Sequence, residues 1–294
     1  METFYLILTN VIGGACYPAT TVALRGFAER DAAFVRMLAC ALLFAPVLWR
    51  SRRRLAGLSL TDWALMAAAG VFGYALPLLL GVYGQKLSSA ASASLLLALE
   101  PVSIVLLSCL FLGERLTGMK VLALTAGLSG TAVIAFQGLP RPGLSATGRL
   151  AGDLLLAAAG ASWALYTVIG KPLLGRVRPL DLTAATTLFG FLGVAAWAAP
   201  GLSPAAWRSA GTGPWLSMVY LAAGGNFLGA LLWNLALENA EASRLANFIF
   251  LQPLVGVTLG ACLLGDALTG WTLAGATLVL AGVWAATRPG SGQE

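Results

Sequence analysis

Long apolar runs, separated by short polar or charged breaks, dominate the hydrophobic pattern of this chain. They give ten candidate helices, at residues 3–24, 32–49, 63–84, 88–112, 119–138, 150–170, 181–199, 215–237, 242–264 and 269–287. Most of them approach the roughly 20 apolar residues that a helix needs to cross a bilayer. They do not alternate apolar with polar residues, as the strands of a membrane β-barrel do. The pattern therefore predicts an all-α integral membrane protein with ten transmembrane helices.

Composition agrees with this prediction and excludes a large soluble part. Of 294 residues, 59% are hydrophobic and 10% are charged, whereas about 25% are charged in a soluble domain. Ten spans use roughly 200 residues, which leaves only short connections. The net charge of +6 would suggest nucleic acid in a soluble protein, but in a membrane protein basic loops orient the helices. We therefore expect membrane lipid around the chain and no nucleic-acid partner.

The basic residues also predict an orientation. If the N-terminus is cytoplasmic, ten of the 18 lie in connections on that side and six lie on the opposite side. Arg50 and the cluster at 52–54 supply four of the ten. Because basic residues concentrate in cytoplasmic loops, this bias predicts that both termini are cytoplasmic.

The two halves of the chain resemble each other. At an offset of 152 residues, segment 99–118 aligns with 251–270, and nine of the twenty positions are identical. At an offset of 146, Gly14 falls on Gly160, so the first helices of the two halves also correspond. We therefore predict two five-helix repeats, at residues 1–140 and 149–288.

Five is an odd number, so the second repeat must enter the membrane from the opposite side. Such inverted repeats are characteristic of secondary transporters, in which the substrate sits near the bilayer midplane and one repeat rocks against the other. The repeat thus favours alternating access over the role of a receptor or scaffold, for which an inverted repeat offers no rationale.

The repeated motif resembles the EamA-type members of the drug/metabolite transporter superfamily. It reads Leu-Glu100-Pro101 in the first half and Leu-Gln252-Pro253 in the second, each followed by Leu-Gly-acid-x-Leu-Thr. The resemblance covers the whole chain. It implies an exporter or permease with ten helices, with a central cavity lined mainly by helices 1, 3, 4, 6, 8 and 9. The aromatic inventory looks most like the exporters of aromatic and other amino acids.

Glu100 is the one acidic residue deep inside an apolar run. A carboxylate at this depth is costly and is a functional candidate by default, as a proton-coupling group or a ligand for a substrate amine. The alternative is structural: a protonated or hydrogen-bonded side chain that compensates for the missing N–H of Pro101. The equivalent residue Gln252 is neutral, which leaves both interpretations open.

Pro101 and Pro253 are candidate hinges for the rocking motion, because a proline within a helix frees a carbonyl and bends the axis. A purely static bend is the alternative. Arg36 is the other ionisable residue within a span, and we expect its side chain to reach the interface from its position near one helix end.

Aromatic and amide side chains inside the spans are candidates for a substrate pocket. Flat apolar walls would hold a side chain, and polar groups would hold the charged ends of an amino acid. The candidates are Asn10, Tyr17, Tyr74, Tyr83, Gln85, Trp163, Tyr166, Asn226, Trp233, Asn234, Asn247 and Gln252. Together with Glu100, we select Tyr17, Tyr74, Trp163, Trp233 and Asn247 as substrate-binding residues. At span ends, Trp49, Trp63, Trp215 and Trp271 fit an interfacial belt better.

Several absences narrow the chemistry. The sequence has no phosphate-binding GxxxxGK[ST] motif, so direct ATP drive is not expected. With no histidine, a Ser-His-Asp triad and a histidine-ligated zinc site are excluded. The four cysteines have no metal-ligand spacing. We therefore expect no cofactor, no metal and no enzymatic activity.

The sequence thus predicts a secondary transporter of a bacterial inner membrane that exports small organic metabolites. Amino acids, including aromatic ones, are the leading substrates, and protons are a candidate coupling ion. A broad-specificity exporter of drugs or cationic compounds is the alternative, in which Glu100 would neutralise the cation. An integral-membrane enzyme acting on lipid-linked substrates is a further alternative of another class.

Overall fold

The computed structural model describes residues 2–87, 99–135, 146–264 and 269–287, and these ranges contain helices and turns but no strand. Within them, eight helices are long and apolar enough to cross a membrane, and two shorter apolar helices span Glu100–Leu112 and Gly118–Ile134. These ten coincide with the ten predicted segments, of which 88–98 and 136–138 lie outside the described residues. The all-α, multi-pass membrane architecture is therefore confirmed.

The first half of the chain contains the following elements: α1 (Glu2–Ala23), α2 (Glu29–Leu55), α3 (Leu60–Gly70), η1 (Val71–Ala75), α4 (Leu76–Leu87), α6 (Glu100–Leu112) and α7 (Gly118–Ala135). The second half contains α8 (Ala146–Leu174), α9 (Pro179–Ala198), η2 (Ala199–Gly201), α10 (Pro204–Ser209), α11 (Thr212–Val219), η3 (Tyr220–Gly229), α12 (Ala230–Asn239), α13 (Ala242–Ala246), η4 (Asn247–Phe250), α14 (Leu251–Leu264) and α15 (Gly270–Thr287).

Several helices extend beyond the apolar runs, because polar residues stabilise their ends. α3 begins at Leu60 rather than 63, since Ser59 and Asp62 form a reciprocal capping box with N–H···O distances of 3.1 and 3.3 Å. α2 continues through the arginines at 52–54 to Leu55, because arginine is a good helix former and a cation near a helix C-terminus is favourable. Hydrophobicity alone therefore underestimates the helix lengths.

Two of the helices contain a π-helical segment, and the two segments occupy equivalent positions. In the first half α3, η1 and α4 run on without a break, and in the second half α11, η3 and α12 do the same. The 152-residue offset places 71–75 on 223–227, inside η3. Hydrophobic periodicity does not predict a π-turn. Because π-bulges occur frequently at functional sites, the pair draws attention to the side chains that it carries.

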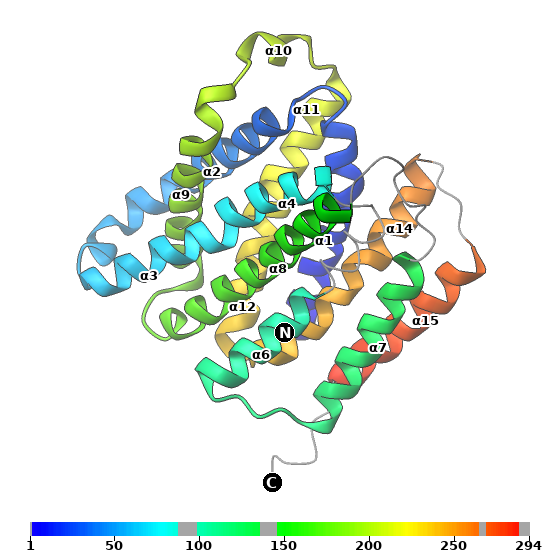
Figure 1. The fold of residues 1–294 in the computed structure, drawn as a ribbon. Coiled ribbons are helices and arrows are strands. Elements are labelled where there is room, and N and C mark those ends of the chain that lie inside the picture. Colours follow the sequence, from blue (N-terminus) through cyan, green and yellow to red (C-terminus); the bar gives the residue numbers. More distant parts are fainter. Residues whose placement is uncertain (1, 88–98, 136–145, 265–268, 288–294) are drawn as a thin grey trace.

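The helix contacts come in matched sets that relate the two halves. α1 packs against α14 as α8 packs against α6, and α1 contacts η3 and α12 as α8 contacts η1 and α4. α2 lies on η3 as α9 lies on η1, while α2 pairs with α9 and α7 pairs with α15 (Figure 1). The antiparallel pair α7 and α15 lies side by side at one flank of the bundle. These contacts between the described helices match in pairs, as two related halves would give.

Small residues permit the closest of these approaches. A Cβ added to Gly130 of α7 would lie 2.6 Å from the Gly275 carbonyl oxygen of α15, and a Cβ added to Gly275 would lie 2.6 Å from the Gly130 oxygen. The backbones touch at this crossing, as they do in membrane helix pairs built on small residues.

Ionic contacts join the connections at one end of the bundle. Arg54, near the end of α2, forms an ion pair of 3.2 Å with Asp181 at the start of α9. Arg176, which follows α8, pairs at 2.8 Å with Asp62 at the start of α3. The connections between α2 and α3 and between α8 and α9 therefore lie at the same end.

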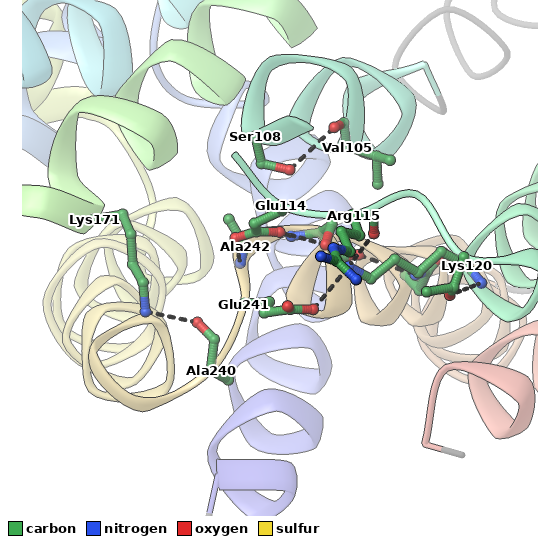
Figure 2. Close-up of polar contacts among 12 residues, drawn as sticks. Val105, Ser108, Glu114, Arg115, Lys120, Lys171, Ala240, Glu241 and Ala242 are labelled. Carbon is green, nitrogen blue, oxygen red and sulfur yellow. Dashed lines mark hydrogen bonds and ion pairs between the residues drawn. The ribbon is translucent and has the colours of Figure 1, made fainter. Parts of the chain in front are cut away.

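A second group of polar contacts ties together the connections α6–α7 and α12–α13 (Figure 2). The Glu114 carboxylate accepts hydrogen bonds from the N–H groups of Ala242 and Ser243, at 2.8 and 2.9 Å, and from the Ser243 hydroxyl. Lys120 forms a 2.7 Å ion pair with Glu241. Glu114 thereby satisfies N–H groups that the start of α13 would otherwise leave unpaired.

The opposite end has its own contact, centred on Asp31 of α2. Its carboxylate accepts from the Ser203 N–H at 2.9 Å and from the Trp207 indole N–H at 2.6 Å. Asp181 accepts a hydrogen bond from the Ser51 hydroxyl at the other end. Both aspartates are the third residue of their helix, and Ser51 and Ser203 are 152 residues apart, so equivalent residues make a related contact at each end.

Candidate functional site

Four aromatic rings from three helical runs form one cluster in the bundle. Trp163 of α8 lies 4.9 Å from Tyr166, 6.1 Å from Trp233 of α12 and 6.4 Å from Tyr74 of η1, measured between ring centroids. Tyr74 and Tyr166 are 5.8 Å apart. The structure thus brings together three of the selected residues, Tyr74, Trp163 and Trp233, and adds Tyr166, which we did not select. Trp163 and Tyr166 are three residues apart on α8 and share a helix face.

A buried amide links this aromatic cluster to α9. The Asn234 side-chain N–H group donates to the Tyr166 hydroxyl at 2.7 Å and to the Thr183 hydroxyl at 2.9 Å. Asn234 and Thr183 are fully buried. Asn234 thereby joins the hydroxyls of Tyr166 and Thr183 through one amide nitrogen.

Several polar atoms in and around the cluster are buried without a hydrogen-bond partner among the described residues. They include the Trp233 indole nitrogen and the Asn234 amide oxygen. Most buried polar groups in proteins are paired, so an unpaired one calls for an explanation such as a ligand or water. Donors and acceptors among aromatic walls are the usual composition of a small-molecule site.

Asn247 lies in η4, the 3₁₀ segment between α13 and α14, and its amide donates to the Ser243 carbonyl oxygen at 3.1 Å. Within the described part of the chain, no ring contact or hydrogen bond joins it to the aromatic cluster. Its placement near the other selected residues therefore remains a prediction.

Glu100 is the first residue of α6 and lies beside α8. A Cβ added to Gly160 would be 3.4 Å from the Glu100 Cα, and Gly160 precedes Trp163 by three residues. The partly buried Glu100 carboxylate has no hydrogen-bond or ion-pair partner in the described ranges. Tyr17 lies against α14, since a Cβ added to Gly256 would be 3.3 Å from its Cδ2, and its side chain is 45% exposed. Glu100 therefore adjoins the aromatic cluster along α8, and the place of Tyr17 in the same site stays a prediction.

The equivalent residue in the second half is paired. Gln252 donates to the Asn10 amide oxygen at 2.9 Å, and Asn10 donates to the Leu6 carbonyl oxygen at 2.8 Å. At an offset of 146, the residue equivalent to Asn10 is Leu156. Glu100 therefore has no amide at the α8 position that corresponds to Asn10.

The two motif prolines occupy first turns of helices. Pro101 is the second residue of α6 and Pro253 is the third residue of α14. Residues 242–264 are nevertheless helical without a break, so Pro253 lies inside a continuous helical run, and the role of both prolines as hinges stays a prediction. In the second half the regular α-helix is interrupted before the proline, by the 3₁₀ segment η4. Residues 88–98, the equivalent region before Pro101, lie outside the described residues.

Arg36 also differs from expectation. Instead of turning to the interface, its guanidinium Nε and Nη2 both donate to the Asn226 amide oxygen, with an Nε–O distance of 2.9 Å. Asn226 belongs to η3, 190 positions away in the sequence. Only the fold reveals this contact, because the sequence contains no pattern that pairs the two residues.

Comparison with known proteins agrees with the fold. An uncharacterized transporter of Archaeoglobus fulgidus is 29% identical over 285 residues, which cover 96% of this chain and 97% of that protein. A probable terminal-alkyne amino-acid exporter of Streptantibioticus cattleyicolor is 29% identical over 291 residues, 96% of this chain and 92% of that protein. A solved crystal structure of a protein superposes with a TM-score of 0.77 over 97% of this chain and 96% of that chain, at 21% identity.

The profile of the EamA-like transporter family matches residues 1–136 and again residues 150–288. The resemblance that the Glu100-Pro101 and Gln252-Pro253 motifs indicated is thereby confirmed over most of the chain. The multi-pass helical fold and the similarity to transporters along the whole length agree with it. This chain belongs to the EamA-like transporter family.

Proposed function

We propose that this membrane transporter is a secondary exporter of small organic metabolites, with amino acids, including aromatic ones, as its main substrates. Transport proceeds by alternating access between two inverted five-helix repeats, residues 1–140 and 149–288. The chain lies in a bacterial inner membrane with both termini cytoplasmic, and it has no enzymatic activity.

The observation that carries the choice of substrate is the aromatic cluster with its unpaired polar atoms. Tyr74, Trp163 and Trp233 offer flat apolar surfaces, and the Trp233 indole N–H and the Asn234 amide oxygen have no partner among the described residues. An aromatic amino acid presents both an apolar ring and polar ends, and such a site suits both. Tyr17, Glu100 and Asn247 complete the proposed substrate-binding set.

The matched helix contacts support the inverted repeat. A pseudo-two-fold relation exchanges the contacts of α1 with those of α8 and sets α2 against α9 and α7 against α15. It also relates η1 to η3 and the contact of Asp31 to that of Asp181. In this scheme Pro101 and Pro253 mark the sites where the fourth helix of each repeat bends.

The similarity to a probable terminal-alkyne amino-acid exporter also supports amino acids as substrates. Glu100 is our candidate for proton coupling, because its carboxylate lies within a span and has no partner among the described residues. The same observation favours the second candidate function, export of drugs or cationic compounds, in which Glu100 binds the cation directly.

The test is solute counterflow into proteoliposomes that contain the purified protein. Labelled phenylalanine, labelled leucine and a labelled lipophilic cation are each measured with and without a pH gradient. We expect saturable phenylalanine uptake that Trp163→Ala reduces strongly, because the substitution removes the centre of the cluster. Trp271→Ala is the matched control, since Trp271 is 67% exposed and lies at the start of a span.

Uptake of the cation without uptake of either amino acid would establish the second candidate. Absence of flux for every solute, from protein that remains monodisperse and folded, would contradict the transport function itself. Equal losses in Trp163→Ala and Trp271→Ala would remove the aromatic cluster as the binding site.

A further inference from the structure

The guanidinium of Arg36 lies within the bundle rather than at a helix end. Arg36 is eight positions into α2, which corresponds to about 10 Å along the helix axis. Its Nε and Nη2 groups both donate to a single atom, the amide oxygen of Asn226. The side chain is therefore held in one orientation against η3.

Asn226 is itself fixed. It is 5% exposed, and its amide nitrogen lies 2.9 Å from the sulfur of Met37. The contact to Met37 directs the amide nitrogen away from Arg36 and leaves the oxygen facing the guanidinium. Asn226 is thus a positioning residue for Arg36, and it contributes no negative charge.

The charge of Arg36 has no counter-ion in the part of the chain that the structure describes. The ion pairs of those residues, Arg54–Asp181, Lys120–Glu241 and Arg176–Asp62, lie in or near the connections. An arginine within a membrane span is costly, and it is usually paired or part of a substrate pathway. A neutral amide satisfies two donors of Arg36 but leaves its charge uncompensated.

The Arg36 guanidinium also has N–H donors that have no further partner among the described residues. A guanidinium carries five N–H groups in a planar fork, and none of the described residues accepts from Nη1. Such a fork matches the two oxygens of a carboxylate. The N–H groups of Arg36 that have no acceptor among the described residues are therefore suited to bind an organic anion.

Small side chains surround this position. A Cβ added to Gly225 would be 2.6 Å from the Cys16 sulfur of α1 and 3.8 Å from Arg36 Nη2, so a larger residue at 225 would clash with Cys16 beside the guanidinium. Cys40 lies one turn from Arg36 along α2. Neither neighbour offers an acidic group at that site.

The position and the aromatic cluster both adjoin α9. Cys40, one turn from Arg36 along α2, packs with Ala184 of α9. A Cβ added to Gly190 of α9 would lie 2.7 Å from the Tyr74 Cβ. Tyr74 in η1 and Asn226 in η3 are also separated by 152 residues, the repeat offset. The two π-helical segments therefore present an aromatic ring in one repeat and the support for a cation in the other.

We propose that Arg36, oriented by Asn226, binds the carboxylate of the exported substrate. The inference rests on the proposed export of amino acids and adds the group that recognises their acidic end. In this arrangement the aromatic cluster contacts the side chain, and Glu100 is left to act on the amine or on a coupling proton.

The experiment measures counterflow of labelled phenylalanine in proteoliposomes of the full chain, with competition by unlabelled phenylalanine, phenylalanine amide and phenethylamine. In the wild-type protein we expect phenylalanine to compete at least about tenfold better than the two compounds without a carboxylate, because a hydrogen-bonded ion pair is lost. Equal competition by all three compounds in the wild type overturns the proposal and needs no variant.

Variants then assign the preference to Arg36. We expect Arg36→Gln to raise the KM for phenylalanine at least about tenfold and to abolish the preference for the carboxylate. Arg36→Lys should restore it in part, since it returns the charge without the fork, and Asn226→Ala should give an intermediate loss. Arg53→Gln, which removes a charge from the exposed end of α2, is the matched control and should leave KM and the preference unchanged.

The outcomes separate the inference from the proposed function. Absence of wild-type flux refutes export of amino acids. Wild-type flux with an unaltered preference in Arg36→Gln refutes the carboxylate site alone. The assay is repeated in vesicles of phosphatidylcholine and of phosphatidylcholine with phosphatidylglycerol; an Arg36→Gln defect confined to the anionic vesicles would assign the arginine to lipid phosphate and overturn the proposal.

Discussion

The Gln252 amide nitrogen lies 2.9 Å from the Asn10 amide oxygen, whereas Glu100, its counterpart in the first half, has no polar partner among the described residues. The difference follows from a single position, because Leu156 stands where the repeat would place a second asparagine. In the second copy of the motif Gln252 is therefore hydrogen-bonded between helices, whereas in the first copy the Glu100 carboxylate is available for other interactions.

This asymmetry predicts a role for Glu100 in the pH dependence of transport. Lowering the pH protonates the carboxylate, and Glu100→Gln mimics the protonated form at every pH. We expect the variant to transport with the rate that the wild-type protein shows at low pH, and to lose its response to pH. Counterflow measured across the pH range checks this.

Gln252→Leu is the matched control, since it changes the equivalent position without removing an ionisable group. It should lower stability through the loss of the Asn10 contact and keep the pH response. A pH profile of Glu100→Gln that parallels the wild type would exclude Glu100 as the coupling group.

The α7–α15 crossing predicts sensitivity to small increases in side-chain volume. A Cβ at Gly130 would lie 2.6 Å from the Gly275 carbonyl oxygen. We expect Gly130→Val to lower the free energy of unfolding by about 1–3 kcal/mol, the usual range for overpacking. The melting temperature in detergent measures the change.

Gly81→Ala serves as the comparison, because a Cβ there meets no atom within 4 Å. It should leave the melting temperature unchanged or raise it slightly, since alanine favours a helix more than glycine does. Similar losses in the two variants would argue against a close backbone approach at Gly130.

The hydrogen bonds of Glu114 are expected to stabilise the connection between α12 and α13. Its carboxylate accepts from two backbone N–H groups and a hydroxyl, so Glu114→Ala leaves these donors unpaired. We expect a loss of about 1–3 kcal/mol, whereas Glu114→Gln should lose less because one oxygen remains. Lys120→Met breaks the ion pair with Glu241, a residue whose side chain is 44% exposed, and the hydrogen bond to the Arg115 carbonyl oxygen, and should cost about 1 kcal/mol.

Asp31 and Asp181 predict local effects at opposite ends of the bundle. Asp181→Asn removes the charge that pairs with Arg54, and it should raise deuterium uptake in the peptide that covers 51–62. Asp31→Asn should raise uptake in 199–210 and leave 51–62 unchanged. Hydrogen exchange with mass spectrometry reads both, and uptake that rises equally at both ends in either variant would contradict separate end contacts.

The sequence determined the ten apolar segments and the correspondence of the two halves, because apolar length and internal repetition are properties of the linear chain. It also singled out Tyr74, Trp163 and Trp233, since aromatic residues inside apolar runs are visible without coordinates. It did not predict the 3₁₀ segment η4 before Pro253, because hydrophobicity does not record where a helix changes its winding.

Only the tertiary structure decided which polar groups meet. Asn234 reaches Tyr166 across two helices, and the π-helical segments rotate Tyr74 and Asn226 to positions that no periodic pattern predicts. Prediction and structure differ most for Arg36. The sequence placed its side chain at the membrane interface, whereas in the structure it is hydrogen-bonded to a residue 190 positions away. The physical reason is that burial follows from local composition, whereas the pairing of side chains depends on how the helices cross.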